Sequence, residues 1–67
     1  MKIFGEKLRE LRKDNNLSAK QLAEQLNVRD STIIRWENGI IEPTISNLYN
    51  IAKYFKVTSD YLIGLED

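Results

Sequence analysis

The 67-residue sequence predicts an all-α fold, a compact bundle of five short helices that forms one domain over residues 1–67. Apolar residues recur every three or four positions in successive segments, and no segment alternates in the way of a half-buried strand. Hydroxyl residues that favour helix starts precede several of these segments, and Asn or Gly follows several of them. A chain of this length is near the lower limit at which a single core is stable without disulfides or metals.

The first two helices are bounded by amide and hydroxyl residues. The first is predicted over about residues 3–14, and Asn15-Asn16 ends it, because asparagine tolerates the left-handed conformation of a helix stop. Ser18 is expected to cap the second helix, with Gln21 completing a capping box, and Asn27 to end it. The inner faces of these two helices are formed by Phe4, Leu8, Leu11, Leu22, Ala23 and Leu26.

The third helix is predicted over about residues 30–38, within the segment DSTIIRWENG. At about 100° per residue, Ile33, Trp36 and Glu37 fall on one side. That side must pack against a core, because so short a helix is not stable alone. Ser31 and Arg35 lie on the opposite side, which is polar.

The last two helices follow a stop at Gly39. Thr44 is expected to cap the fourth helix, whose apolar residues at helical spacing are Ile45, Leu48, Ile51, Ala52 and Phe55. Thr58 is expected to cap a short fifth helix. Asp60 then lies near its positive end, and Leu62 lies inside.

The composition excludes several classes of function. The chain has no cysteine and no histidine, so it lacks thiolate metal ligands, disulfides and the usual general base. No nucleophile–base pair or glycine-rich phosphate loop is recognisable, so we expect no enzyme activity, no cofactor and no metal site. The start, MKIFGEKLRE, is no signal peptide, and no apolar run approaches the roughly 18 residues of a membrane span. We therefore expect a cytoplasmic protein that is not bound to a membrane.

The formal net charge is zero, but the charges are unevenly distributed. Residues 1–35 carry eight basic and five acidic side chains, a net +3, and residues 36–67 carry two and five, a net −3. This asymmetry suggests a partner for one side. The isoelectric point of 6.2, however, lies well below the value of about 9 that is typical of nucleic-acid binders. Charge alone thus favours a merely solvated surface.

The second and third helices are separated by only about three residues, 27–29, which sets them at a steep angle. Such a corner is either purely structural or presents the second of its helices to a DNA major groove. The run LSAKQLAEQLNVRDSTIIRWENG resembles the helix-turn-helix of the Xre family, which includes the lambdoid phage repressors and Cro. The segments LRELRKDNNLS, EPTISNL and FKVTSDYLIG extend the resemblance over nearly the whole chain. It implies a five-helix, lambda-repressor-like DNA-binding domain, usually dimeric, with its helix-turn-helix at helices two and three.

Arg12 and Glu37 match a pair of this family in which an arginine on the first helix bonds a glutamate that ends the third. The pair explains why a carboxylate shares the inner side with Ile33 and Trp36, since a buried charge needs a partner. The alternative is that Glu37 is solvated. Trp36 is expected in the core, rather than as a platform on which bases stack.

The residues expected to contact DNA are Ser18, Arg29, Asp30, Ser31, Thr32, Arg35 and Asn38. Arg35 and Ser31 match family positions that reach base edges, and an arginine can bond guanine O6 and N7 bidentately. The alternative for Arg35 is an ordinary solvated side chain. Asp30 can accept from cytosine N4, but we favour a role in stabilising the helix start. Thr32 and Ser18 match positions that contact phosphate.

The chain departs from the family pattern in several places. Ala19 stands where glutamine is common, and Arg29 replaces the usual Ser or Thr cap but can contact phosphate instead. Ile40-Ile41 replaces basic residues, which weakens salt-dependent affinity and calls for burial against Trp36 or another chain. Ile34 either meets a thymine methyl group or packs on Ala19, and we favour the packing.

We therefore predict a sequence-specific DNA-binding transcriptional regulator that reads the major groove with residues 30–38. Repression is favoured, from a palindromic operator in double-stranded DNA, by a homodimer associated with the nucleoid. The predicted dimer surface consists of Tyr61, Ile63 and Leu65, unless these residues complete the core. The rival function is a protein-interaction module on the same fold, an antitoxin or anti-repressor partner. It is favoured by the neutral charge and the apolar residues at positions 34, 40 and 41.

Overall fold

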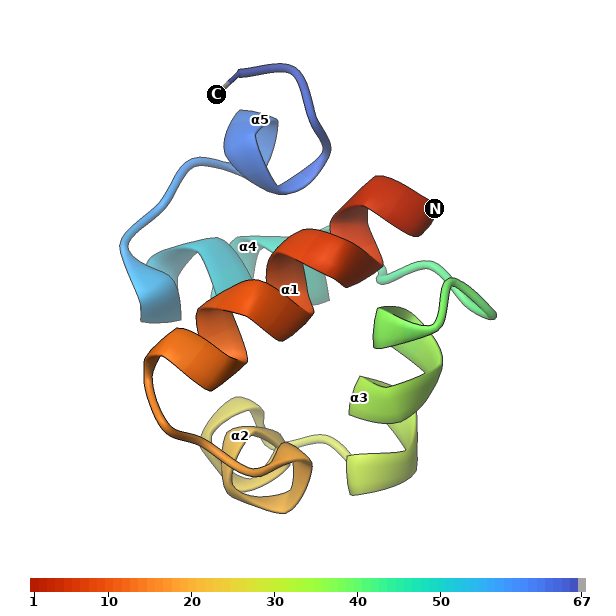
Figure 1. Ribbon diagram of the computed structural model, residues 1–67, viewed down its shortest axis with the longest axis vertical. Helices are drawn as coiled ribbons and strands as arrows, with labels where there is room; N and C mark the ends of the chain where they lie inside the picture. Colours follow the sequence, from red (N-terminus) through yellow and green to blue (C-terminus); the bar gives the residue numbers. More distant parts are fainter. Residues whose placement is uncertain (67) are drawn as a thin grey trace.

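The computed structural model describes residues 1–66 and shows five α-helices in that range, as predicted (Figure 1). They are α1 (Lys2–Asp14), α2 (Ala19–Leu26), α3 (Asp30–Glu37), α4 (Ile45–Phe55) and α5 (Ser59–Leu62). The last residue of the predicted domain, residue 67, lies outside the described range. The bundle measures 28 × 23 × 20 Å along its principal axes.

Hydroxyl side chains begin three of the helices, as predicted. Ser18 Oγ accepts from the backbone N–H of Gln21, and the Gln21 side chain accepts from the N–H of Ser18, which completes the capping box of α2. Thr44 and Thr58 each accept from the N–H three residues further on, at the starts of α4 and α5. These bonds satisfy backbone donors that have no partner within the helix.

The helix stops rely on left-handed backbone conformations. Asn16 and Asn27 have φ angles of 58°, and Gly39 has one of 72°, as the sequence led us to expect. Lys56 also has a positive φ, of 57°, where it ends α4. That stop was not predicted, because lysine has no particular preference for this conformation.

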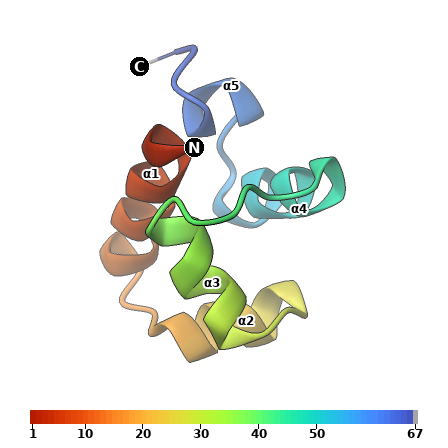
Figure 2. The same ribbon diagram turned by 90° about the vertical axis from the view of Figure 1, so that its right-hand side faces the viewer.

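The core lies between the five helices. Its buried apolar residues are Phe4, Leu8, Leu22, Ala23, Leu26, Ile33, Trp36, Ile51 and Leu62. Ile45 recurs at helical spacing with Leu48 and Ile51, but its side chain is not part of the core and is 87% exposed. The start of α4 projects beyond the other helices (Figure 2).

The helix-turn-helix lies at one end of the bundle and the chain termini at the other. In Figure 1 α2 is seen end-on, while the axis of α3 lies roughly in the plane of the picture. The two helices therefore form the predicted steep corner. α1 packs against α3, and α5 contacts α1 and α4 at the end away from α2. The start of α3 is therefore remote from α5 and from both termini.

Gly5 allows α1 to approach the end of α3 closely. A Cβ atom at this position would lie 2.5 Å from the carbonyl oxygens of both Trp36 and Glu37. Such a separation is far below van der Waals contact, so any other residue would force the two helices apart. Gly5 is buried, and it sets the distance between α1 and the helix whose outer side carries the candidate site.

Candidate nucleic-acid interface

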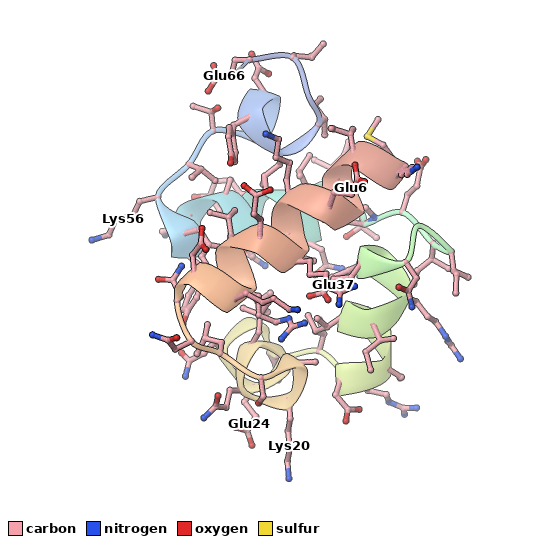
Figure 3. All side chains as sticks on the ribbon, in the orientation of Figure 1. Glu6, Lys20, Glu24, Glu37, Lys56 and Glu66 are labelled. Atoms are coloured by element: carbon pink, nitrogen blue, oxygen red, sulfur yellow. The ribbon has the colours of Figure 1, made fainter. Side chains whose placement is uncertain are left out.

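A shielded ion pair joins α1 to the end of α3. Arg12 Nε donates to Glu37 Oε2 at 2.6 Å, and Arg12 Nη2 donates to Glu37 Oε1 at 2.9 Å. The two side chains are only 15% and 6% exposed, and Figure 3 shows Glu37 between α1 and α3. Hydrogen bonding to Glu37 raises the pKa of the Arg12 guanidinium, although burial works in the opposite direction. Glu37 is therefore a paired residue and not a solvated one.

The same arginine also fixes the approach to α2. Its Nη1 donates to the backbone carbonyl of Leu17 at 3.0 Å, just before the cap residue Ser18. Arg12 thus bonds the end of α3 and the start of α2 at once. Bidentate geometry of this kind restricts orientation as well as distance.

α3 has one buried side and one exposed side, as its sequence predicts. Ile33 and Trp36 are 0% and 2% exposed, and the ring of Trp36 meets that of Phe4 edge-on at 6.3 Å between centroids. Trp36 is therefore a core residue that cannot stack on bases. Ser31 and Arg35 are exposed on the outer side of the helix.

The start of α3 is stabilised by Asp30 and not by its cap residue. Arg29 occupies the N-cap position and makes no side-chain cap bond. Asp30 Oδ1 accepts from the N–H of Ser31 at 2.8 Å, which agrees with the favoured role of this carboxylate. Within residues 1–66 no hydrogen bond or ion pair holds the exposed Arg29 side chain, so it is available to a phosphate.

Further polar side chains of the candidate site lie at the start of α2 and along α3. Ser18 is exposed and uses its oxygen as a cap acceptor, which leaves its hydrogen free to donate. Thr32 is half-buried, and Asn38 is exposed at the end of α3. The sequence interpretation missed Lys20, which is exposed on the first turn of α2 and points away from the bundle in Figure 3. The net positive charge of residues 1–35 was its only signal.

The outer side of α3 has the dimensions and chemistry for a major groove. A helix with its side chains is about 10–12 Å wide, and the groove of B-DNA is about 12 Å wide. Ser31 and Arg35 are one turn apart, so together they span about two base-pair steps. Arg29 and Lys20 add positive charge near the helix starts, where phosphates are bound most readily.

The apolar loop after α3 is not buried against Trp36, which was one of its two expected locations. Ile40 is 68% exposed and Ile41 is 39% exposed.

Within residues 1–66 no cluster of acidic side chains is able to hold a metal ion. In the same range no helix has both the length and the apolar character that crossing a membrane requires.

Comparisons with known proteins agree with this architecture. The HTH_3 family, described as helix-turn-helix, matches residues 8–62. The HTH-type transcriptional activator BcrR of Enterococcus faecalis is 45% identical over 64 residues, which cover 96% of this chain and 31% of BcrR. The HTH-type transcriptional regulator DicA of Escherichia coli is 31% identical over 65 residues, 96% of this chain and 48% of DicA. The chain thus spans about a third to a half of these relatives.

Two solved structures superpose closely on the bundle. The P22 c2 repressor in complex with a synthetic operator has a TM-score of 0.86 and 29% identity, over 92% of this chain and 94% of the repressor. A transcriptional regulator from Listeria innocua has a TM-score of 0.87 and 36% identity, over 96% of this chain and 60% of the regulator. The predicted lambda-repressor-like fold is confirmed, and the chain belongs to the HTH_3 family of helix-turn-helix proteins.

Proposed function

We propose that this chain is the sequence-specific DNA-binding part of a transcriptional regulator and that α3 enters the major groove of its operator. The observation that carries the proposal is the exposed polar side of α3, a helix whose end Arg12 joins to the segment that leads into α2. The close match to a repressor bound to operator DNA supports the same function.

Each residue of the candidate site has a role in this proposal. Arg35 bonds a guanine edge at the centre of α3, and Ser31 contacts the base pair about two steps away. The residues that contact phosphate and so fix the register of α3 on the duplex are Ser18, Arg29, Thr32 and Lys20. Asn38 contacts the sugar–phosphate backbone of the DNA from the end of α3. Asp30 stabilises the helix start and makes no base contact.

The proposed effect on transcription is repression. A domain that occupies the major groove over a promoter excludes other proteins from that site by its bulk alone. Activation requires an additional favourable contact with the transcription machinery. Because the relatives include both an activator and repressors, the effect of the whole protein depends on where its operator lies.

We propose that the chain binds DNA as a homodimer on a palindromic operator. One eight-residue helix reads only a few base pairs, so useful affinity requires two of them one helical turn apart, about 34 Å. The predicted dimer surface near α5 offers little apolar area, because Tyr61 and Ile63 are half-buried and only Leu65 of the three is mostly exposed. Ile45 and Tyr49 on α4 are 87% and 62% exposed, and we place the contact there.

Selection of bound sequences from random duplex DNA tests the proposed function. Enrichment of a palindrome with half-site centres about 10 base pairs apart supports both DNA reading and the dimer. The rival, a protein-interaction module, is favoured by the exposed apolar residues Ile40 and Ile45 and by the zero net charge. Failure to enrich any sequence, even at low salt where phosphate contacts are strongest, would favour this rival.

A further inference from the structure

Ile34 is an apolar residue on the side of α3 that is otherwise polar. The other two large apolar residues of α3, Ile33 and Trp36, are buried in the core. Ile34 remains 49% exposed, so the bundle covers only about half of its surface. An exposed isoleucine side chain is unfavourable in water, so a partner that covers it binds more tightly.

The helix geometry places Ile34 at the edge of the base-reading ridge. Ser31 and Arg35 form the centre of the exposed side, and Ile34 lies about 100° around the helix from Arg35. It is one turn after Asp30, on the flank of that ridge. The favoured packing on Ala19 does not bury Ile34, since about half of its surface is still open to solvent.

The major groove offers one apolar group that matches this position. Guanine and adenine present polar acceptors and donors, whereas thymine adds a C5-methyl group. Across the major-groove edge of a base pair the purine N7 lies toward one wall and the thymine C5-methyl toward the other, with the polar C6 and C4 substituents between them. A central arginine and a flanking isoleucine are therefore directed at different base edges.

We propose that Ile34 is a specificity-determining residue that contacts the C5-methyl group of a thymine in each half-site. This inference rests on the proposed function, because it requires α3 in the major groove. The thymine lies within about two base-pair steps of the guanine that Arg35 bonds, since adjacent helix residues rise only 1.5 Å. The operator thus combines one polar and one apolar recognition element on a single turn of helix.

Replacement of thymine by uracil in the selected duplex tests this contact, because the exchange removes only the methyl group. Each thymine is replaced in turn, and the affinity of the wild-type protein is measured at one fixed salt concentration. Burial of one methyl group stabilises by about 0.8 kcal/mol, so the replacement at the critical position should weaken binding about fourfold. Replacement in both half-sites should weaken binding about fifteenfold.

The variant Ile34→Ala should bind the thymine and uracil duplexes equally. Arg35→Ala should bind both more weakly but keep the preference for thymine. Leu65→Ala is the matched control, because Leu65 is a 72% exposed apolar residue that follows α5, far from the start of α3. It should retain the wild-type preference, and urea unfolding should show all three variants to be folded.

The outcomes separate this inference from the function on which it rests. If the wild type binds its selected duplex but no uracil replacement changes its affinity, the thymine contact is refuted while DNA reading stands. If Ile34→Ala keeps the wild-type preference for thymine, another residue reads the methyl group and the assignment is wrong. If the wild type selects no duplex at all, the proposed function and this inference fail together.

Discussion

Arg12 and Glu37 are joined by two parallel hydrogen bonds of 2.6 and 2.9 Å, and this one contact links the first helix to the end of the recognition helix. The remaining guanidinium nitrogen bonds the carbonyl of Leu17 before α2. A residue that belongs to neither helix therefore bonds both the end of α3 and the segment that leads into α2. Because both charges are largely shielded from water, removing either one leaves the other without a partner.

Glu37→Ala should lower the free energy of unfolding by about 3–5 kcal/mol, because it leaves the Arg12 guanidinium shielded and unpaired. Small domains have only about 5–15 kcal/mol in total, so this variant should be partly unfolded at modest temperature. Urea unfolding measures the change. Glu10→Ala, an exposed carboxylate on α1, is the control and should change stability by less than about 0.5 kcal/mol. Equal midpoints for the two variants would contradict a structural role for the pair.

Gly5→Ala should destabilise the domain by roughly 1–3 kcal/mol, although alanine is the better helix former. The added methyl group would meet the carbonyl oxygens of Trp36 and Glu37 at 2.5 Å. Thermal unfolding of this variant is compared with that of Glu6→Ala, the next residue on α1, which is exposed. A Gly5→Ala domain at least as stable as the wild type would show that α1 can move away from α3 without cost.

Arg29→Ser should change stability and DNA affinity in opposite directions. Serine is a good N-cap and arginine is not, so the free energy of unfolding should rise by about 0.5–1 kcal/mol. If Arg29 contacts a phosphate, the slope of log affinity against log salt should fall by about 0.9 per half-site. Titrations at three or more salt concentrations give this slope. A more stable variant with an unchanged slope would remove Arg29 from the phosphate contacts.

Ile45→Asp should shift the protein from dimer to monomer, because it places two like charges across a two-fold contact on α4. The substitution leaves the fold intact, since Ile45 is 87% exposed and an aspartate is favourable in the first turn of a helix. Leu65→Asp, near α5, should leave the dimer unchanged. Sedimentation of the three proteins, free and on a palindromic duplex, measures the difference. A monomeric Leu65→Asp with a dimeric Ile45→Asp would reverse the assignment.

Local patterns predicted most of the fold. The capping box of Ser18 and Gln21 and the left-handed Asn27 depend only on neighbouring residues, so sequence suffices to place them. The helix period also predicted which side of α3 is buried, because short helices pack with one stripe. Ile45 and Gly5 depend instead on how far other helices extend, which no local pattern contains.

The candidate site was predicted less completely than the fold. The exposure of Ser31 and Arg35 followed from the helix period, and the unused cap at Arg29 followed from residue type. Lys20 was missed, because a lone lysine on a helix surface is usually just solvated. The DNA contacts of all these residues remain predictions, because base recognition depends on a surface that only the duplex supplies.

The most direct test of the central claim is the affinity of Arg35→Ala for the selected duplex and its single-base variants at several salt concentrations. Arg35 is exposed, so unfolding should be unchanged, while affinity should fall by about 1–3 kcal/mol per half-site. Preference should relax at one base position only. Lys56→Gln, which removes a charge far from α3, is the control (Figure 3). Affinity of Arg35→Ala equal to that of the wild type on every duplex and at every salt concentration would contradict reading of the major groove by this side of α3.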